Sequence, residues 1–387
     1  MPSSLPERPR ILFLFSDTGG GHRSAAEAII EALHLEYGDQ VSTQMVDFLK
    51  DFAPRPLNHL PALYPKVVRL PQAWEAGWHL SNGRHRVRAI TATVYPYIRR
   101  TMRQLIAQYP CDMIVSVHPL ANAPLLRAFG KSHPYFITVV TDLVTTHALW
   151  YHHKVDLCIV PTEEAHQRAL KFGLRPDQVL TVGIPVADRF CQPPGSRSAL
   201  RGRFGWPQDR PLILLVGGGE GMGHLERSAN SIAYACPSAA LIIITGRNRN
   251  LKAKLEARDW PIPTFVYGFV QEMPEFMRAA DVLVTKAGPG TISEALIAGL
   301  PMILYDRLPG QEEGNVTYIV TEGAGVWAPR ADLIVETLQA WLAHPEPQAK
   351  AAAACKRLAR PQAARQIARI LAEKLNIQKT TEEILNL

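Results

Sequence analysis

The chain has 387 residues, 47% hydrophobic and 20% charged, a balance that predicts two globular domains and excludes a disordered protein. Its five cysteines are scattered and contain no CxxC pair, which argues against a disulfide framework or a structural zinc site and favours a reducing compartment. No stretch approaches 18 uninterrupted apolar residues and the first ten are unlike a signal peptide, so neither a membrane-spanning nor a secreted chain is expected.

A strand, a glycine loop and a helix are predicted at the start of the chain. The apolar run 11–15 is followed by three glycines at 19–21, and then by apolar residues at helical spacing, namely Ala25, Ala28, Ile29, Ala32 and Leu33. Successive glycines let the backbone approach a ligand closely, and the helix start directs N–H groups toward it. We therefore expect Gly20 and Gly21 to lie against an anionic or oxygen-rich ligand.

His22 stands at the start of this predicted helix, at the ligand edge of the expected sheet. A neutral imidazole in that position can take a proton from a hydroxyl group near neutral pH. The residues alone leave a capping or packing role equally open.

The excess positive charge is concentrated in the next segment. The net charge is +7, and between Arg55 and Arg103 nine Lys or Arg stand against one acid, Glu75. Trp74 and Trp78 lie one helical turn apart in the apolar, proline-containing stretch 52–80. Aromatic anchors beside cations are typical of a peripheral membrane contact, and the alternative is a helix that packs on the core.

Three further apolar runs predict strands at 113–117, 136–140 and 157–160, separated by helical periodicity. This is the pattern of a parallel sheet with crossover helices. We interpret His152 and His153 as structural, because adjacent side chains point apart.

The second half repeats this pattern after a Pro- and Gly-containing linker at 191–196, with strands predicted at 212–216, 241–244, 282–285 and 302–305. We predict an α/β fold of two facing Rossmann-like domains, 1–192 and 197–345, followed by a helical tail at 346–387 that crosses back onto the first domain or packs locally. Ligands are expected in the cleft between the domains.

Two glycine-rich loops follow strands of the second half. The segment 217–223 holds five glycines in seven residues, more than a turn needs, and predicts a loop that a phosphate or sugar approaches. The segment 286–295 contains a Gly-Pro-Gly turn and a helix start that would attract a diphosphate, capped by Thr291 or Ser293. Glu294, expected in the first turn, is either a capping carboxylate or an acceptor for ribose hydroxyls.

A polar loop at 309–315 follows the last predicted strand, and its Gln311, Glu312 and Asn315 suit sugar hydroxyls as well as solvent. The sequence contains no Asp-x-Asp and no His, Asp or Glu group with metal-ligand spacing. We therefore expect neither a metal nor a cofactor, and we expect helix dipoles and backbone N–H groups to carry the diphosphate charge.

In order and spacing, these motifs resemble the monogalactosyldiacylglycerol synthase family, which shares the two-domain GT-B fold with processive diacylglycerol glucosyltransferases and the lipid-II-forming peptidoglycan transferase. The resemblance runs nearly end to end and rests on SDTGGGHR (16–23), SVHPL (116–120), TDLVTTHALWYH (141–152), GGGEGMG (217–223), TGRN (245–248), GFVQEM (268–273), TKAGPGTISEA (285–295) and PGQEEGN (309–315). Two positions depart from the family pattern: Thr245, where cysteine is common, and His224, where proline is frequent.

The resemblance implies a role for each matching residue. It makes His22 the base that deprotonates the acceptor hydroxyl as it attacks the anomeric carbon with inversion. It places a UDP-galactose or UDP-glucose donor among Gly20, Gly21, Gly219, Met222, Arg247, Phe269, Val270, Lys286, Gly288, Pro289, Gly290, Thr291, Glu294, Gln311, Glu312 and Asn315. Within this set Glu294 binds the ribose, the backbone at 269–270 reads uracil, and Gln311 with Glu312 holds the hexose. The acceptor or membrane side would include Trp74, Trp78, Asp142, His147 and Trp150.

The resemblance thus implies a hexosyltransferase that acts on diacylglycerol at an anionic membrane surface, peripheral on the inner, cytoplasmic face. Galactose is favoured as the sugar, and glucose is the alternative. Other readings are a UDP-sugar epimerase, a transferase with a soluble or polyprenyl acceptor, and a non-catalytic nucleotide or nucleic-acid binder. The last reading leaves His22 unexplained, and no nucleic-acid partner is expected.

Overall fold

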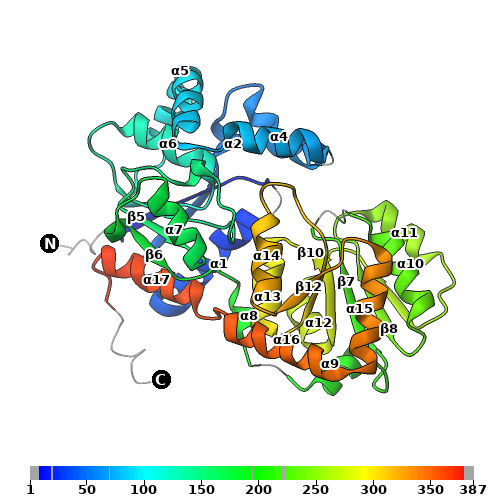
Figure 1. Ribbon diagram of the computed structural model, residues 1–387. Coiled ribbons are helices and arrows are strands. Elements are labelled where there is room, and N and C mark those ends of the chain that lie inside the picture. Colours follow the sequence, from blue (N-terminus) through cyan, green and yellow to red (C-terminus); the bar gives the residue numbers. More distant parts are fainter. Residues whose placement is uncertain are drawn as a thin grey trace. The chain divides into compact units, whose positions relative to one another are not determined.

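The computed structural model describes residues 8–18, 21–68, 70–193, 195–219, 221 and 223–378. Contacts divide the chain into two compact units (Figure 1). The first contains the residues up to Asp188 and those from Gln362 onward, and the second is Arg189–Pro361. The boundary therefore lies just before the linker predicted at 191–196, and the tail at 346–387 is divided between the units.

The first unit is built on a parallel sheet with the strand order β2-β1-β3-β4-β5-β6. Its strands are β1 (Arg10–Phe15), β2 (Ser42–Asp47), β3 (Met113–Ser116), β4 (Tyr135–Val139), β5 (Leu157–Val160) and β6 (Val179–Thr181). β2 pairs with one side of β1 and β3 with the other, so the direction of winding reverses between β1 and β3. Open α/β sheets bind ligands at the carboxyl ends of the strands at such a switch point.

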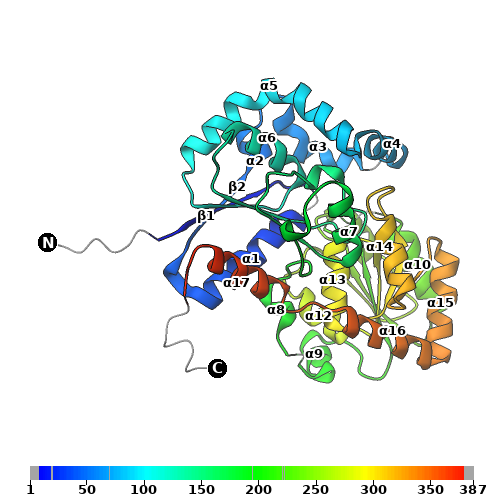
Figure 2. The same cartoon turned by 60° about the vertical axis from the view of Figure 1, so that its left-hand side comes forward.

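Helices cover both faces of this sheet (Figure 2). They are α1 (Gly21–Tyr37), α2 (Phe48–Phe52), α3 (Leu60–Val67), α4 (Pro71–Ser81), α5 (Arg84–Gln108), α6 (Pro119–Phe129), α7 (Glu163–Lys171) and α17 (Ala363–Lys374), with short 3-10 turns η1 (Gly38–Gln40), η2 (Leu57–His59), η3 (Ala148–Trp150) and η4 (Pro176–Gln178). One face packs against α1 and α17, and the other against α2, α5 and α6. The apolar face predicted for the first helix is confirmed, because all five of its residues are buried in α1.

Helix α17 belongs to the first unit although it comes from the end of the chain. Its Ile367 and Leu371 are fully buried in the cluster that contains Ile29 and Leu33 of α1. The side chain of Glu36 on α1 is only 3% exposed, and it accepts hydrogen bonds from the guanidinium groups of both Arg365 and Arg369. A buried carboxylate needs such pairing, so the ion pairs fix α17 in one position on α1.

The second unit contains another parallel sheet, with the order β12-β11-β10-β7-β8-β9 and a switch point between β7 and β10. Its strands are β7 (Leu212–Val216), β8 (Ala240–Ile244), β9 (Thr264–Tyr267), β10 (Val282–Lys286), β11 (Met302–Asp306) and β12 (Gly325–Trp327). Its helices are α9 (Arg197–Phe204), α10 (Leu225–Ala235), α11 (Arg249–Glu256), α12 (Met273–Ala279), α13 (Pro289–Ala298), α14 (Glu313–Thr321), α15 (Ala331–Ala343) and α16 (Pro345–Leu358), and α8 (Asp188–Cys191) contains the boundary between the units. Helices α10 and α15 pack on one face, while α12 packs on β7 and α16 packs on α13.

The strands predicted from apolar runs are confirmed to within one residue at each end, and they are the eight central strands of the two sheets. The sequence did not reveal β2, β6, β9 and β12, which are the four edge strands. In the part of the chain that the structure describes, no helix has the length and apolar character needed to traverse a bilayer.

Candidate active site

The switch point of the first sheet brings two histidines together. His22 lies in the first turn of α1, after β1, and His118 follows β3 as the residue that caps α6. Their ring centroids are 4.5 Å apart in an edge-to-face arrangement. Residues far apart in the sequence therefore form one polar cluster at the ligand-binding edge of this sheet.

The imidazole of His22 is positioned by a threonine on the loop after β4. Thr141 Oγ1 lies 2.8 Å from His22 Nδ1. Burial lowers the pKa of His22 below its ordinary value, against the opposing effects of Asp142, the Val117 backbone and Asp17. The ring is therefore mainly neutral at pH 7, and in the tautomer that donates Nδ1–H to Thr141 its Nε2 carries the lone pair that a general base needs.

His118 is buried and fixed in one tautomer. Its Nδ1 accepts from the Leu120 N–H at 3.3 Å, so the ring proton is on Nε2, which donates to Thr18 Oγ1 at 3.0 Å. Burial, and then the neighbouring His22, lower the pKa of His118 well below its usual range. Sequence analysis gave His118 no role, although it follows a buried strand and precedes a helix, as His22 does.

Asp142 and Trp150 form a buried pair beside His22. Trp150 Nε1 donates to Asp142 Oδ2 at 2.7 Å, and the Trp150 ring centroid lies 6.0 Å from that of His22. Trp150 is 0% exposed, and its place on the acceptor side stays a prediction. It holds the Asp142 carboxylate near the histidine.

The other residues expected on the acceptor side, Trp74, Trp78 and His147, also lie close together in this unit. The Trp78 ring packs edge-to-face on His147 at 4.7 Å, and His147 Nε2 lies 3.1 Å from Ser81 Oγ. Burial is the main reason that the pKa of His147 is lowered to about 4. Trp74 stacks edge-to-face on Tyr64, and no residue of α4 is fully buried, so both tryptophans are partly exposed at the surface of this unit.

An ion pair closes the glycine loop at the start of α1. Arg23 donates from Nε and Nη2 to the two carboxylate oxygens of Asp17, at 2.8 and 2.6 Å, and its guanidinium lies over the Phe15 ring. Gly21 begins α1, with open space where a Cβ would stand. Gly20 lies outside the described residues.

In the second unit, the loops after β7 and β8 touch backbone to backbone. Gly246 has φ +58°, and a Cβ there would lie 2.3 Å from the Gly219 carbonyl oxygen, so only glycine fits. Arg247 donates its backbone N–H to that same carbonyl at 2.8 Å, and its guanidinium lies over the exposed ring of Phe269. Val270 follows Phe269 in the loop after β9 and is partly buried, whereas Met222 lies outside the described residues.

Helix α13 begins with an uncapped turn at the switch point. Its N-cap is Gly288, with no side-chain capping bond, and Pro289 is the first helical residue. Ser293 donates to the Pro289 carbonyl, and neither Thr291 nor Ser293 caps the helix, so the predicted cap is wrong. Glu294 lies in the second turn and not in the first, while its ribose role stays a prediction. The N–H groups of Gly290 and Thr291, in the first turn of α13, have no helical acceptor, and Lys286 ends the preceding strand β10. This arrangement suits an anion.

Glu294 has an unusual protonation equilibrium. Burial raises the pKa of its carboxyl group to about 7, although Arg189 acts in the opposite direction. The group is thus about half ionised near neutral pH.

The loop after β11 is tied to the loop after β10. Glu312 is buried, and its Oε2 accepts from the Leu308 N–H at 2.7 Å. The Asn315 amide donates to the Ala287 carbonyl at 2.9 Å, while its buried Oδ1 has no hydrogen-bond partner among the described residues. Gln311 is partly buried in the same loop. Within the described ranges, no three His, Cys, Asp or Glu side chains are grouped so that they could hold a metal ion.

Comparison with known proteins relates both halves of the chain to glycosyltransferases. Residues 22–186 match the family model described as monogalactosyldiacylglycerol (MGDG) synthase, and residues 212–370 match the glycosyltransferase family 28 C-terminal domain. The chain is 40% identical over 348 residues to the chloroplastic MGDG synthase of Spinacia oleracea, covering 87% of this chain and 67% of that protein. The chain belongs to the monogalactosyldiacylglycerol synthase family. The family predicted from the motifs is therefore confirmed.

A second plant MGDG synthase shows a similar level of identity to this chain. MGDG synthase 1 of Arabidopsis thaliana, also chloroplastic, is 40% identical over 347 residues, covering 87% of this chain and 65% of that protein. The chain thus spans about two thirds of the length of these plant relatives.

Solved structures show the fold. The chain aligns with MurG of Acinetobacter baumannii at a TM-score of 0.61 and 14% identity, covering 94% of this chain and 99% of that one. It aligns with a UDP-GlcNAc 2-epimerase of Neisseria meningitidis bound to UDP-GlcNAc at 0.60 and 14%, covering 95% and 99%. The predicted α/β fold of GT-B type, with two Rossmann-like domains, is confirmed.

Proposed function

We propose that this member of the MGDG synthase family transfers galactose from UDP-galactose to diacylglycerol with inversion, giving a β-linked monogalactosyldiacylglycerol. The observation that carries the proposal is His22, a largely neutral imidazole held by Thr141 at the ligand edge of the first sheet. The family name supports the choice of sugar and acceptor.

In the proposed reaction, the free hydroxyl of diacylglycerol attacks the anomeric carbon of the donor. Its proton moves to His22 Nε2, the bond from the anomeric carbon to the diphosphate oxygen breaks, and UDP leaves with the electron pair. Asp142 stabilises the imidazolium that forms, because it already acts to raise the pKa of His22.

We place the donor at the switch point of the second sheet. The N–H groups of Gly290 and Thr291, with Lys286 and Arg247, would stabilise the negative charge that develops on the diphosphate. Glu294 would accept from the ribose hydroxyls and the backbone of Phe269 and Val270 would read uracil.

The hexose would be bound by the loop after β11. Gln311 and Glu312 would hold its hydroxyls, and the Asn315 Oδ1 is a buried acceptor that still lacks a donor in the described structure. A site with such an acceptor favours a ligand that brings a hydroxyl group, because a buried polar atom without a partner is costly.

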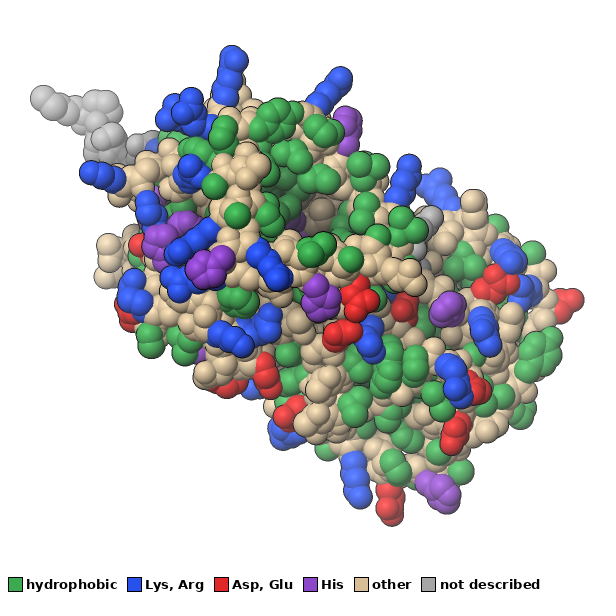
Figure 3. Space-filling model, turned by 45° about the horizontal axis from the view of Figure 1, so that its top comes forward, with side chains coloured by type: hydrophobic (Ala, Val, Ile, Leu, Met, Phe, Trp, Pro, Cys, Tyr) green, Lys and Arg blue, Asp and Glu red, His purple; other side chains and the backbone are tan. Residues whose placement is uncertain are grey.

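The acceptor is a membrane lipid, and we propose that the segment from α3 to α5 contacts the bilayer. Among the residues that the structure describes, twelve large hydrophobic side chains are exposed, and seven of them lie there, namely Leu60, Leu63, Val67, Leu70, Leu80, Ile90 and Tyr97. This segment, at the top of Figure 1, faces forward in Figure 3, where hydrophobic side chains gather with Lys and Arg at the margin. Each cation near an anionic leaflet adds about 1 kcal/mol, which supports a peripheral position on the cytoplasmic face.

The test is to incubate the purified chain with diacylglycerol-containing vesicles and radiolabelled UDP-galactose or UDP-glucose, and to identify the lipid product. A galactolipid with a β linkage is the expected result. A glucolipid product would show that glucose, and not galactose, is the transferred sugar. The absence of any lipid-soluble product from either donor would refute the proposal. Activity toward a soluble acceptor without vesicles would refute diacylglycerol as the acceptor.

A further inference from the structure

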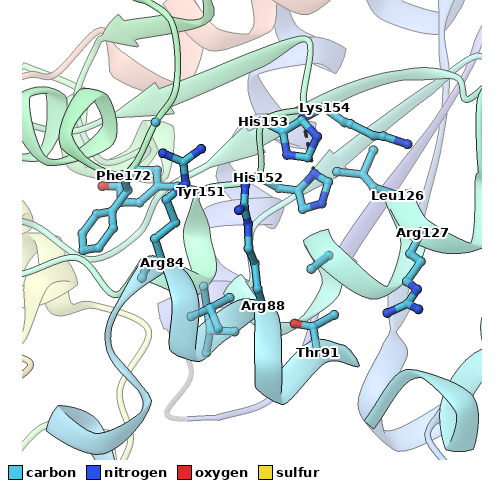
Figure 4. A pocket seen from close by; sticks show the side chains of 15 residues that line it. Arg84, Arg88, Thr91, Leu126, Arg127, Tyr151, His152, His153, Lys154 and Phe172 are labelled. Atoms are coloured by element: carbon cyan, nitrogen blue, oxygen red, sulfur yellow. Dashed lines mark hydrogen bonds between the residues drawn. The ribbon is translucent and has the colours of Figure 1, made fainter. Parts of the chain in front are cut away.

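A cavity lies in the first unit, and none of the residues proposed for catalysis lines it. Its volume is about 340 Å³, and its walls come from α5, α6, the segment around η3 and the end of α7. Figure 4 shows Arg88 extending from α5 toward His152, and Arg84 extending from α5 toward Tyr151 and Phe172. The cavity is therefore a feature of this unit alone.

The cavity wall is strongly cationic. Arg84, Arg88, Arg127 and Lys154 line it together with His152 and His153, and none of its lining residues that the structure describes is an Asp or Glu. Lys154 donates to the Gly130 carbonyl and Arg127 lies over the Tyr95 ring. In the described part of the chain, Arg84 and Arg88 have neither a hydrogen bond nor a carboxylate partner, so their charge is uncompensated.

His152 adds a neutral donor to the two guanidinium groups. Its Nδ1 accepts from the Lys154 backbone N–H at 3.3 Å, so the ring proton is on Nε2. Burial, then His153, Lys154 and Arg88, lower the pKa of His152 to about 4, so the ring is neutral at pH 7. The two histidine rings are stacked, with centroids 4.7 Å apart, which corrects the expectation that they point apart.

The backbone at the end of α7 makes room for one of these cations. Gly173 has φ +99°, and a Cβ there would lie 2.9 Å from the guanidinium carbon of Arg84. The glycine thus lets Arg84 lie flat against the chain at the cavity wall.

We propose that this cavity binds one phosphate group, carried by a phospholipid headgroup or by a small soluble phosphate ester. A phosphate offers several acceptor oxygens and no obligatory donor, which complements two arginines and an imidazole N–H. Arg guanidinium is planar and forms bidentate bonds to phosphate, so Arg84 and Arg88 provide the specific contacts. The cavity adjoins the acceptor stretch, because Ala148, Leu149 and Tyr151 line it and flank Trp150.

The experiment measures binding to the full chain by calorimetry with inorganic phosphate and glycerol 3-phosphate at constant ionic strength. In parallel, sedimentation compares phosphatidylcholine vesicles with and without phosphatidylserine. The test variant is Arg84→Gln/Arg88→Gln. The control is Lys131→Gln/Lys171→Gln, which removes the same charge from exposed positions of the first unit, outside both the cavity and the segment from α3 to α5. His152→Leu removes one donor without changing the charge at pH 7.

We expect the Arg84→Gln/Arg88→Gln variant to bind the phosphate probe at least about tenfold more weakly, while the control keeps wild-type affinity, because each charge-assisted bond is lost outright. His152→Leu should weaken binding several-fold. If the Arg84→Gln/Arg88→Gln variant loses binding of inorganic phosphate and glycerol 3-phosphate, the ligand is a soluble ester. If it loses only the vesicle binding that depends on phosphatidylserine, the ligand is a lipid headgroup. If no probe binds, or if both double variants lose binding equally, the cavity is not a phosphate site.

Discussion

Thr141 Oγ1 lies 2.8 Å from Nδ1 of His22, although 118 residues separate the two in the chain. The contact joins the loop after β4 to the first turn of α1. It fixes the orientation of the one imidazole at the switch point to which we assign proton transfer. The roles of both residues can be separated experimentally.

Replacing His22 by Ala should reduce kcat by about 100-fold or more, because a positioned general base contributes at least that factor. Affinity for UDP, measured by calorimetry, should remain within about twofold, since the donor loops lie in the other unit. A variant that keeps more than a tenth of the wild-type rate would remove His22 from the role of base.

Thr141→Val should lower kcat by roughly tenfold, because it removes the hydroxyl that orients His22 while keeping the side-chain shape. Thr141→Ser should restore most of the rate. A purely structural role predicts instead a lower melting temperature in Thr141→Val, with no recovery by serine. Rates at saturating donor and melting curves distinguish the two.

The pH dependence of donor binding should follow Glu294, whose pKa is about 7. If the carboxylate binds the ribose, UDP affinity falls as pH drops through 7, and it should be about tenfold weaker at pH 6 than at pH 8. The Glu294→Gln variant should bind UDP weakly at both pH values. Any pH dependence of UDP affinity that remains in this variant reports the titration of UDP itself. An unchanged profile in Glu294→Gln would exclude this role.

The same group should affect stability. A carboxyl group whose pKa is raised on folding stabilises the protein below its unfolded pKa and loses that contribution as pH rises through 7. Glu294→Gln should therefore be more stable than wild type at pH 8, by roughly 3 kcal/mol at most, and similar at pH 4. Chemical denaturation at the two pH values provides the measurement.

Gly290→Ala and Gly246→Ala should behave differently. A Cβ at Gly290 meets no atom within 4 Å, so the variant should fold with unchanged or slightly higher stability but bind UDP at least about tenfold more weakly, because the methyl stands where the diphosphate is proposed. Gly246→Ala should lose stability as well as affinity, since its Cβ meets the Gly219 carbonyl at 2.3 Å. Normal UDP affinity in Gly290→Ala would contradict the proposed diphosphate position.

Leu371→Ala tests the placement of α17 on the first unit. Leu371 is 0% exposed, so its truncation should cost about 2 to 5 kcal/mol in the free energy of unfolding of that unit. Glu373→Ala, at an exposed position of the same helix, should change it by less than about 0.5 kcal/mol. Equal effects of both variants would mean that α17 does not pack on α1.

Local patterns in the sequence determined the central architecture and the chemical candidates. The eight central strands are buried on both faces and therefore read as continuous apolar runs, whereas edge strands such as β2 and β9 are partly exposed and give no such run. Glycine loops after those runs identified His22, Gly219 and the start of α13, because a strand, a loop and a helix are neighbours in sequence as well as in space. The family resemblance supplied their roles.

Only the tertiary structure decided which distant groups meet. It placed His118 and Thr141 on His22, paired Trp150 with Asp142, returned α17 to the first unit and gathered Arg84, Arg88 and His152 around one cavity. It also set the pKa of Glu294 and the uncapped start of α13. The physical reason is that the pKa of a side chain and its packing depend on burial and on neighbours that the folded chain brings together. Residue order along the chain does not directly encode those contacts.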